Sequence, residues 1–197
     1  MNKVTRLEVI ELLVGLPGVN HHSLNVDMNG IYEDKKHHSP TRIADARKRP
    51  GYERPEKGTI DENWRMFSAI TLEDLQVIQE GYLEKYGKEV GSILPGWLGP
   101  NIVFQGMDGF SKIPVDTVID FPEGPAFIVT GENKSCATPG KLIANMLDLP
   151  IEDASYFVKV ADGYRGVVGK IIRPGRLDSG MVADMYQPTI DFRRLAT

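Results

Sequence analysis

The sequence predicts a mainly β protein of the α+β class: a β-barrel with a few inserted helices. Several short runs of β-branched and aromatic residues are each bounded by Gly, Pro or Asp, as expected of short strands. The chain contains 20 Gly and 13 Pro in 197 residues, above the roughly 12% of an average protein, so it turns often. The helical patterns are few and do not alternate with the strands, which argues against parallel βαβ units. One domain covering residues 1–197 is expected.

The first half of the chain is expected to contain a strand, a long loop and a helix. Residues 4–14 partly alternate between apolar and polar and are rich in Val, which favours a strand, with a short helix as the alternative. Residues 33–65 are basic, polar and rich in Pro and Gly, and so long a loop in a compact domain is usually functional or disordered. A helix is expected over residues 71–87, because Thr71 can cap its first amides and apolar residues then recur at helical spacing.

The second half is expected to return to β structure around short helices. Three short strands are expected, at residues 101–105, 117–121 and 126–130. A helix is expected over residues 140–149, beginning near Pro139. Residues 155–160 are ambiguous between structures. Residues 165–173 are expected to form a last strand, followed by a turn at Pro174-Gly175.

Composition limits the class of protein. Hydrophobic residues make up 41% and charged residues 25%, which is typical of a globular protein rather than a disordered one. The net charge of -4 argues against a dedicated nucleic-acid-binding protein. The single cysteine excludes an internal disulfide and a four-cysteine zinc site, so a reducing, cytoplasmic location is the default expectation. No segment approaches the roughly 18 apolar residues of a membrane span, and no membrane association is expected.

Common catalytic and nucleotide-binding motifs are missing from the sequence. There is no HExxH or CxxC spacing for zinc, no GxxxxGK phosphate loop, no GxGxxG after a strand and no GxSxG elbow. The histidine pairs at residues 21–22 and 37–38 are adjacent in sequence, and adjacent side chains on a strand point to opposite faces. Neither pair is therefore expected to chelate a metal by itself.

Cys136 is the first candidate for chemistry. It follows an expected strand and precedes an expected helix, in a loop of small and polar residues that also contains Lys134. A cysteine thiolate is a soft metal ligand, a nucleophile and a possible persulfide carrier. The alternative is that Cys136 is a small apolar residue buried in the core, as free cysteines often are.

A set of basic residues is the second candidate. Lys36, His37, His38 and Arg42 occur together in the long loop, and their side chains are suited to an anionic group. Arg165 lies in a glycine-rich segment, where close backbone approach would let it clamp an anion. The alternatives are a solvated charged loop for the first group and a barrel corner for the second.

Four segments in order resemble the MOSC domain, the module named for the C-terminal part of molybdenum cofactor sulfurases. They cover Gly30 to Arg42, Trp97 to Ile102, Gly131 to Cys136 and Tyr164 to Gly175. The resemblance spans about residues 25–187 and places the only cysteine of the chain at the position of the family's cysteine. The sequence departs from the family pattern at Glu33-Asp34, where the family has Gly-Asp.

This resemblance implies a β-barrel-rich fold and a link to the molybdenum–pterin cofactor (molybdopterin) or to sulfur transfer. In one role Cys136 would ligate molybdenum in an enzyme that reduces N-hydroxylated compounds. The family's site would then place the cofactor's phosphate or pterin against the following residues: Lys36, His37, His38, Arg42, Glu132, Asn133 and Arg165. The substrate would be a small molecule, and electrons would come from a separate donor protein, since the chain has no ferredoxin-type cysteines and no flavin fingerprint.

Two other functions remain open at this stage. Cys136 could carry a persulfide received from a separate sulfur-donor protein. Alternatively, the barrel and basic loop could form a non-catalytic module that binds an anion or a partner. In any of these roles, residues 44–63 are hypothesised to close over the pocket when an anion binds, because the segment is long, basic and rich in Pro and Gly.

Overall fold

The computed structural model describes residues 5–44 and 56–187 of the chain. Seven strands form a closed barrel in the order β13-β9-β10-β11-β7-β8-β1, which the pairing of β13 with β1 completes. Their bounds are β1 (Thr5–Gly15), β7 (Phe67–Thr71), β8 (Ile102–Gln105), β9 (Val118–Asp120), β10 (Ala126–Glu132), β11 (Val167–Arg173) and β13 (Val182–Tyr186). The mainly β barrel predicted from the sequence is therefore confirmed.

β1 organises the barrel because it pairs with three strands along its length. Its first residues pair with β13, its middle with β8 and its end with β2 (Gly18–His21). The register shifts between Val9 and Glu11, as at a β-bulge, which bends the strand between its partners. The expected strand at residues 4–14 is confirmed, and the alternative of a short helix is wrong.

The helix α1 (Leu72–Tyr86) connects β7 to β8, which pair in parallel. A parallel pair needs a crossover of this kind, because the chain must return to the same end of the sheet. Thr71 caps the helix by accepting a hydrogen bond of 3.2 Å from the amide of Asp74, and Gly87 ends it at a φ of 84°. Both ends agree with the helix expected from the sequence.

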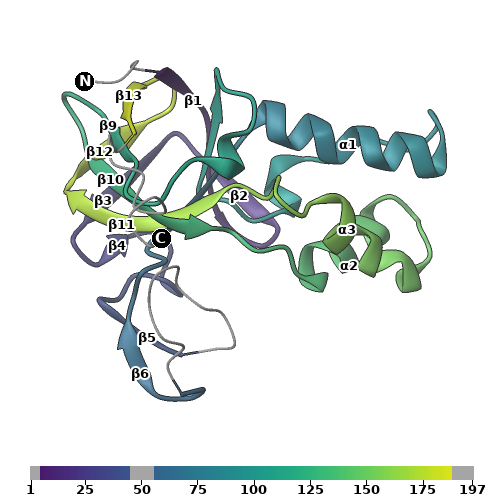
Figure 1. Ribbon diagram of the computed structural model, residues 1–197, viewed down its shortest axis with the longest axis horizontal. Coiled ribbons are helices and arrows are strands. Elements are labelled where there is room, and N and C mark those ends of the chain that lie inside the picture. Colours follow the sequence, from purple (N-terminus) through teal and green to yellow (C-terminus); the bar gives the residue numbers. More distant parts are fainter. Residues whose placement is uncertain (1–4, 45–55, 188–197) are drawn as a thin grey trace, which may run out of the picture.

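Two further helices lie beside α1 (Figure 1). They are α2 (Ala137–Met146) and α3 (Ala154–Val160), so α2 begins three residues before the expected Gly140. A Cβ on Gly140 would lie 2.0 Å from the carbonyl oxygen of Ala154, which shows how closely the two helices approach. The ambiguous residues 155–160 belong to α3. Short 3-10 turns cover η1 (Pro95–Trp97), η2 (Phe110–Lys112) and η3 (Ile151–Asp153).

The remaining strands lie outside the barrel. β12 (Gly175–Asp178), β3 (Ser23–Asp27) and β4 (Gly30–Ile31) form a small antiparallel sheet. β5 (Thr41–Ile43) and β6 (Ile60–Glu62) form a hairpin that projects from the barrel at the bottom of Figure 1. The sequence predicted only loop over residues 33–65, and the hairpin corrects that prediction. The hypothesis that residues 44–63 close over the site falls largely outside the described residues.

The core has two parts. One fills the barrel with aromatic rings, among them Phe67, Phe104, Phe110, Phe121 and Phe127. The other lies between the barrel wall and the helices and includes Ile78, Tyr82, Ile143 and Phe157. The helices are therefore fixed to one side of the barrel. Among the helices in the described ranges, none is long and apolar enough to cross a membrane.

Candidate functional site

Cys136 lies at the start of α2, where it is the N-cap residue in an extended conformation. Its side chain is exposed, so the alternative that it is a buried apolar residue is wrong. The neighbouring Ser135 donates a hydrogen bond of 3.0 Å to the carbonyl of Val158 on α3. The loop before the cysteine, residues 133–135, is called the cysteine loop below. This hydrogen bond holds it against the adjacent helix, while the thiol itself remains accessible.

The buried side chain of Arg165 also binds the cysteine loop. Its Nη1 donates to the carbonyl of Lys134 at 3.2 Å and to Oδ1 of Asn133 at 3.3 Å, and its Nη2 donates to the carbonyl of Leu98 at 2.6 Å. The guanidinium also lies over the ring of Phe157, 5.8 Å from its centroid. Arg165 is only 9% exposed, and its hydrogen bonds to Asn133 and Lys134 position the cysteine loop. Direct contact between Arg165 and a cofactor stays a prediction.

A buried polar network supports this arrangement from α1. Asp74 accepts hydrogen bonds from the amides of Gly109 and Ser111 and from the hydroxyl of Ser111, the last at 2.5 Å. The same hydroxyl accepts the amide of Gly166 at 2.6 Å, and the carbonyl of Gly166 accepts the amide of Asn133 at 2.9 Å. Burial raises the pKa of Asp74 above its ordinary value, although the hydrogen bonds from Ser111 oppose the shift.

Gly166 must be a glycine for this network to form. Its φ is 86°, and a Cβ there would lie 1.9 Å from the carbonyl oxygen of Ala69 on β7. The sequence drew attention to this glycine-rich segment, but nothing in the sequence indicated Ser111 or Asp74 as its partners. Their connection to the site depends on tertiary contacts between residues 37 and 55 positions apart.

Arg65 is a site residue that the sequence analysis did not single out. It comes just before β7, and its Nη2 donates a hydrogen bond of 2.9 Å to Oδ1 of Asn133. Two guanidinium groups lie near the ring of Trp64, with that of Arg42 5.3 Å and that of Arg65 5.4 Å from the ring centroid. Trp64 therefore lies near both Arg42 on β5 and Arg65, and Arg65 shares the side chain of Asn133 with Arg165.

Asp34 and His37 form a second polar group. His37 Nδ1 lies 2.9 Å from Oδ2 of Asp34, and Nδ2 of Asn101 donates to the same oxygen at 3.1 Å. Burial opposes ionisation of Asp34, but the hydrogen bonds and charge of His37, together with Asn101, prevail and lower its pKa. The amide of Asn63 holds the carbonyl of His37 at 3.0 Å.

This second group is joined to the cysteine loop through two segments. The backbone amide of Arg65 donates to Asn63, whose side chain holds His37. Asn101, which holds Asp34, lies three residues after Leu98, whose carbonyl Arg165 binds. His37, Asn133 and Arg165 therefore belong to one connected region.

The other candidates have different surroundings. His38 Nε2 lies 2.9 Å from both carboxylate oxygens of Asp27, and its ring meets Tyr32 edge-on. Glu132 pairs with Lys134 and accepts the amide of Gly163. Lys36 is exposed. His38 therefore contacts the last residue of β3, Asp27, and the residue after β4, Tyr32. Cofactor binding by Lys36, His38, Arg42 and Glu132 stays a prediction.

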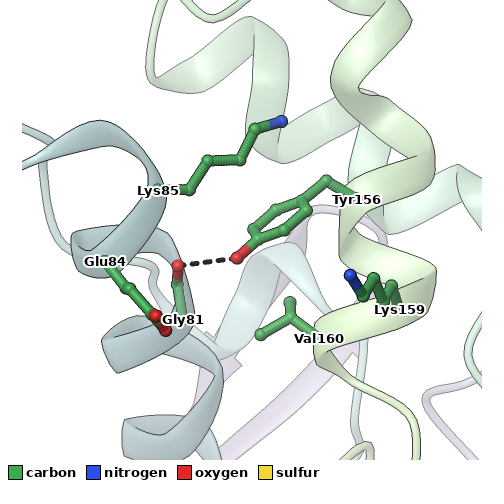
Figure 2. Close-up of a pocket in the computed structure, with 6 residues that line it drawn as sticks. All are labelled: Gly81, Glu84, Lys85, Tyr156, Lys159 and Val160. Atoms are coloured by element: carbon green, nitrogen blue, oxygen red, sulfur yellow. Dashed lines mark hydrogen bonds between the residues drawn. The ribbon is translucent and has the colours of Figure 1, made fainter.

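A groove outside this region runs between α1 and α3. It has a volume of about 430 Å³ and is lined by Gly81, Glu84, Lys85, Tyr156, Lys159 and Val160. Figure 2 shows Tyr156 reaching across from α3 to donate its hydroxyl proton to the carbonyl of Gly81 on α1, at 2.8 Å. Lys85 is paired with Asp153 at 2.8 Å. In the described part of the chain, no three His, Cys, Asp or Glu residues gather as a metal cage.

The closed barrel agrees with the β-barrel-rich fold that the family resemblance implied. Residues 34–183 match the model of the MOSC domain, and the chain belongs to that family. YuaD of Bacillus subtilis strain 168, which is named for metal-sulfur cluster biosynthesis, is 36% identical over 157 residues. These residues cover 80% of this chain and 76% of YuaD.

Solved structures agree with this assignment. The crystal structure of YuaD matches with a TM-score of 0.83 at 29% identity, covering 96% of this chain and 100% of that one. YiiM from Escherichia coli matches with a TM-score of 0.55 at 13% identity, covering 94% of this chain and 72% of that one. YiiM from Geobacillus stearothermophilus gives 0.59 at 11%, covering 94% and 77%. The two YiiM structures show the shared fold alone.

Proposed function

We propose that this MOSC protein binds the molybdenum–pterin cofactor beside the cysteine loop, with the Cys136 thiolate as a ligand to molybdenum. The observation that carries the proposal is the exposed thiol of Cys136, next to a loop that Arg65 and Arg165 both contact through Asn133. Thiolate is the soft ligand type that such a metal takes, and guanidinium groups suit a phosphate. The family assignment supports the choice of cofactor.

The residues present fit such a group. Cys136 would supply the thiolate, and Asn133 and Glu132 would offer polar atoms to the pterin edge. Lys36, His37, His38, Arg42 and Arg165 would offer hydrogen-bond donors to the phosphate. When bound, the cofactor would supply two-electron chemistry suited to reducing N-hydroxylated compounds, with electrons from a separate donor protein.

The chain's own contribution to this function would be positioning. Ser135 and Arg165 hold the cysteine loop against α3 and the segment at Leu98, so that the exposed thiol starts from a fixed backbone. Such restraint reduces the conformational entropy lost when a ligand binds. The thiol would be ready for its ligand without rearrangement of the loop.

A second candidate function is that of a persulfide carrier. The exposure of Cys136 favours it, because a carrier must meet the active site of another protein, and the name of YuaD concerns metal-sulfur chemistry. The Cys136 thiolate would attack the outer sulfur of a donor protein's persulfide. The donor's S–S bond would break, the donor thiolate would leave with the proton given up by Cys136, and the outer sulfur would end on Cys136. No external oxidant is needed.

One preparation tests both functions. The protein is purified from a host that makes the molybdenum cofactor, beside Cys136→Ala and Cys136→Ser. Molybdenum is measured by mass spectrometry, and pterin by fluorescence after oxidation. Near-stoichiometric metal and pterin in the wild type, both lost from the variants, would support the cofactor proposal. Metal-free protein with a mass increase of about 32 Da that dithiothreitol removes would support the carrier.

A third outcome would overturn both proposals. If the wild type contains neither cofactor nor persulfide and behaves like Cys136→Ala, the chain is a non-catalytic module that binds an anion or a partner. Donor proteins and substrates would then have no role at the cysteine.

A further inference from the structure

A second pocket lies where the start of α1 approaches β1, β8 and β13. Its volume is about 490 Å³, which is within the range of small-molecule sites. It shares no residue with the cofactor site proposed above. The residues that line it are Arg6, Glu8, Glu73, Gln105, Gly106 and Val182.

Glu73, in the first turn of α1, lines this pocket with a carboxylate that is only half satisfied. Its Oε1 accepts the amide of Gly106 at 2.7 Å, whereas its Oε2 is shielded from water and has no hydrogen-bond partner among the described residues. The next residue, Asp74, accepts hydrogen bonds on both of its oxygens. A carboxylate oxygen that loses water without gaining a donor is destabilised, so a donor that reaches Oε2 of Glu73 is strongly favoured.

Glu8 supplies a second carboxylate to the pocket. Its Oε2 accepts a hydrogen bond of 2.7 Å from Nε2 of Gln105. Gln105 and Gly106 are consecutive in the chain, so one short segment holds one oxygen of Glu8 and one oxygen of Glu73. The two like charges repel each other, and a cation between them would relieve that repulsion.

The charges around the pocket also favour a cation. Among the described residues that line it, Arg6 is the one basic side chain, and its Nε lies 3.5 Å from Oδ1 of Asp184. Three carboxylates, those of Glu8, Glu73 and Asp184, therefore accompany one guanidinium. Because no three His, Cys, Asp or Glu residues of the described ranges gather as a metal cage, an organic cation fits better than a metal ion.

The oxygens that are already engaged decide which organic cation fits. A guanidinium group binds a carboxylate best through a fork to both oxygens, but Glu73 and Glu8 each have one oxygen occupied. An ammonium group is a compact charge with three donors, and it can use one oxygen from each carboxylate. Val182, which is 47% exposed, offers an apolar contact for an alkyl chain.

We propose that this pocket, called the amine pocket below, binds a small aliphatic primary amine. Glu73 and Glu8 hold the ammonium group, and the alkyl chain lies against Val182. A rotation of the Glu73 side chain turns Oε2 to the ligand while Oε1 keeps the amide of Gly106. The inference goes beyond the proposed function and does not rest on it.

NMR titration of the full chain, labelled with nitrogen-15, tests the amine pocket with n-butylammonium as the probe. The ionic strength is held constant, so that changes in screening do not imitate binding. The amide of Gly106 is the reporter because it donates to Glu73. Its signal should move and saturate with n-butylammonium. The n-butylguanidinium ion should bind more weakly, and tetramethylammonium, which has no donor, should not saturate the signal.

Substitutions identify the carboxylates responsible. Glu73→Gln keeps the shape of the side chain and an acceptor for Gly106, and should weaken binding about 10-fold or more through loss of a charged hydrogen-bond partner. Glu8→Gln should weaken binding less, since Glu8 is exposed. Glu80→Gln is the matched control. Glu80 is exposed on the same helix, where it accepts from Gln76 at 3.0 Å, and its loss should change the affinity by no more than about twofold.

The outcomes decide the proposal whatever the fate of the cofactor experiment. A wild-type Gly106 signal that does not respond to n-butylammonium, or equal affinity in Glu73→Gln and the wild type, would overturn the amine pocket. Tighter binding of n-butylguanidinium would overturn the choice of an amine. Thermal melts separate lost binding from lost folding. If Glu73→Gln does not fold, Glu8→Gln decides the question, and an unchanged affinity there would count against the pocket.

Discussion

Replacing Ser111 by Ala should destabilise the protein more than any ordinary serine substitution. The Ser111 hydroxyl is buried, donates to the Asp74 carboxylate at 2.5 Å and accepts the amide of Gly166 at 2.6 Å. Removing it leaves that amide without this partner, at a cost of about 1–3 kcal/mol, and deletes a charge-assisted hydrogen bond of about 1.5–3 kcal/mol. We therefore expect a loss of about 4 kcal/mol in the free energy of unfolding. For a chain of this size, that corresponds to a fall in Tm of roughly 8–16 °C.

The pH dependence of this loss has a defined sign. Burial raises the pKa of Asp74 above its ordinary value of 3.8, and the hydrogen bonds from Ser111 pull it back. Without the hydroxyl the pKa rises further, so the folded state binds a proton that the unfolded state releases. Stability then falls as pH rises through the window between 3.8 and the raised pKa. Ser111→Ala should therefore lose more stability at neutral pH than at mildly acidic pH.

Urea unfolding at both pH values measures the effect. Ser155→Ala is the control, because Ser155 is exposed and its hydroxyl makes only a long contact of 3.4 Å with the carbonyl of Glu152. It should change the free energy of unfolding by no more than about 0.5 kcal/mol. A loss below about 1 kcal/mol in Ser111→Ala would show that the network between α1 and Gly166 is not an important source of stability.

Three further substitutions test other parts of the structure. Gly140→Ala should cost about 3 kcal/mol or more in urea unfolding, because the new Cβ would lie 2.0 Å from the carbonyl oxygen of Ala154 and force α2 away from α3; a near-neutral result would contradict this packing. Asp34→Asn should destabilise the protein at neutral pH. Because the pKa of Asp34 is lowered, its stabilisation is present above the ordinary 3.8 and is lost as pH falls through the folded pKa, so the difference from wild type should shrink in acid; a difference independent of pH would refute it. Cys136→Ala should leave Tm nearly unchanged, since the side chain is exposed; a large drop would give the cysteine a structural role.

The sequence predicted the barrel class, the first strand and the long helix, because each has a strong local signal. The Thr71 cap and the apolar spacing after it are sufficient to place α1. β12 and β13 were missed, although β13 closes the barrel, since Gly175–Asp178 and Val182–Tyr186 mix strand formers with Gly, Asp and Met. Their strand structure depends on pairing with β3, β1 and β9, which lie far away in the chain.

The candidate site also contains residues that the sequence could identify and residues that it could not. Cys136 could be identified because it is the only cysteine and lies at a strand-to-helix junction. Arg65 could not be identified, because in a stretch already rich in Lys and Arg no single residue is distinguished until Asn133 is placed against it. His37 and His38 were singled out together, but the structure gives them different contacts. His37 faces the connected region, whereas His38 turns to Asp27 on β3.

The order of strands in the barrel explains why distant segments meet at this site. Asn133 follows β10, Arg165 precedes β11, Arg65 precedes β7, and the Leu98 segment precedes β8. These four strands are consecutive neighbours in the sheet, β10-β11-β7-β8, although they occur in a different order along the chain. The parallel crossover through α1 is what sets β7 and β8 side by side, so the segments before them begin at the same end of the pair. Closing the barrel in this order therefore brings Arg65 and Arg165, which are far apart in sequence, to the loop that contains Asn133 and ends at Cys136.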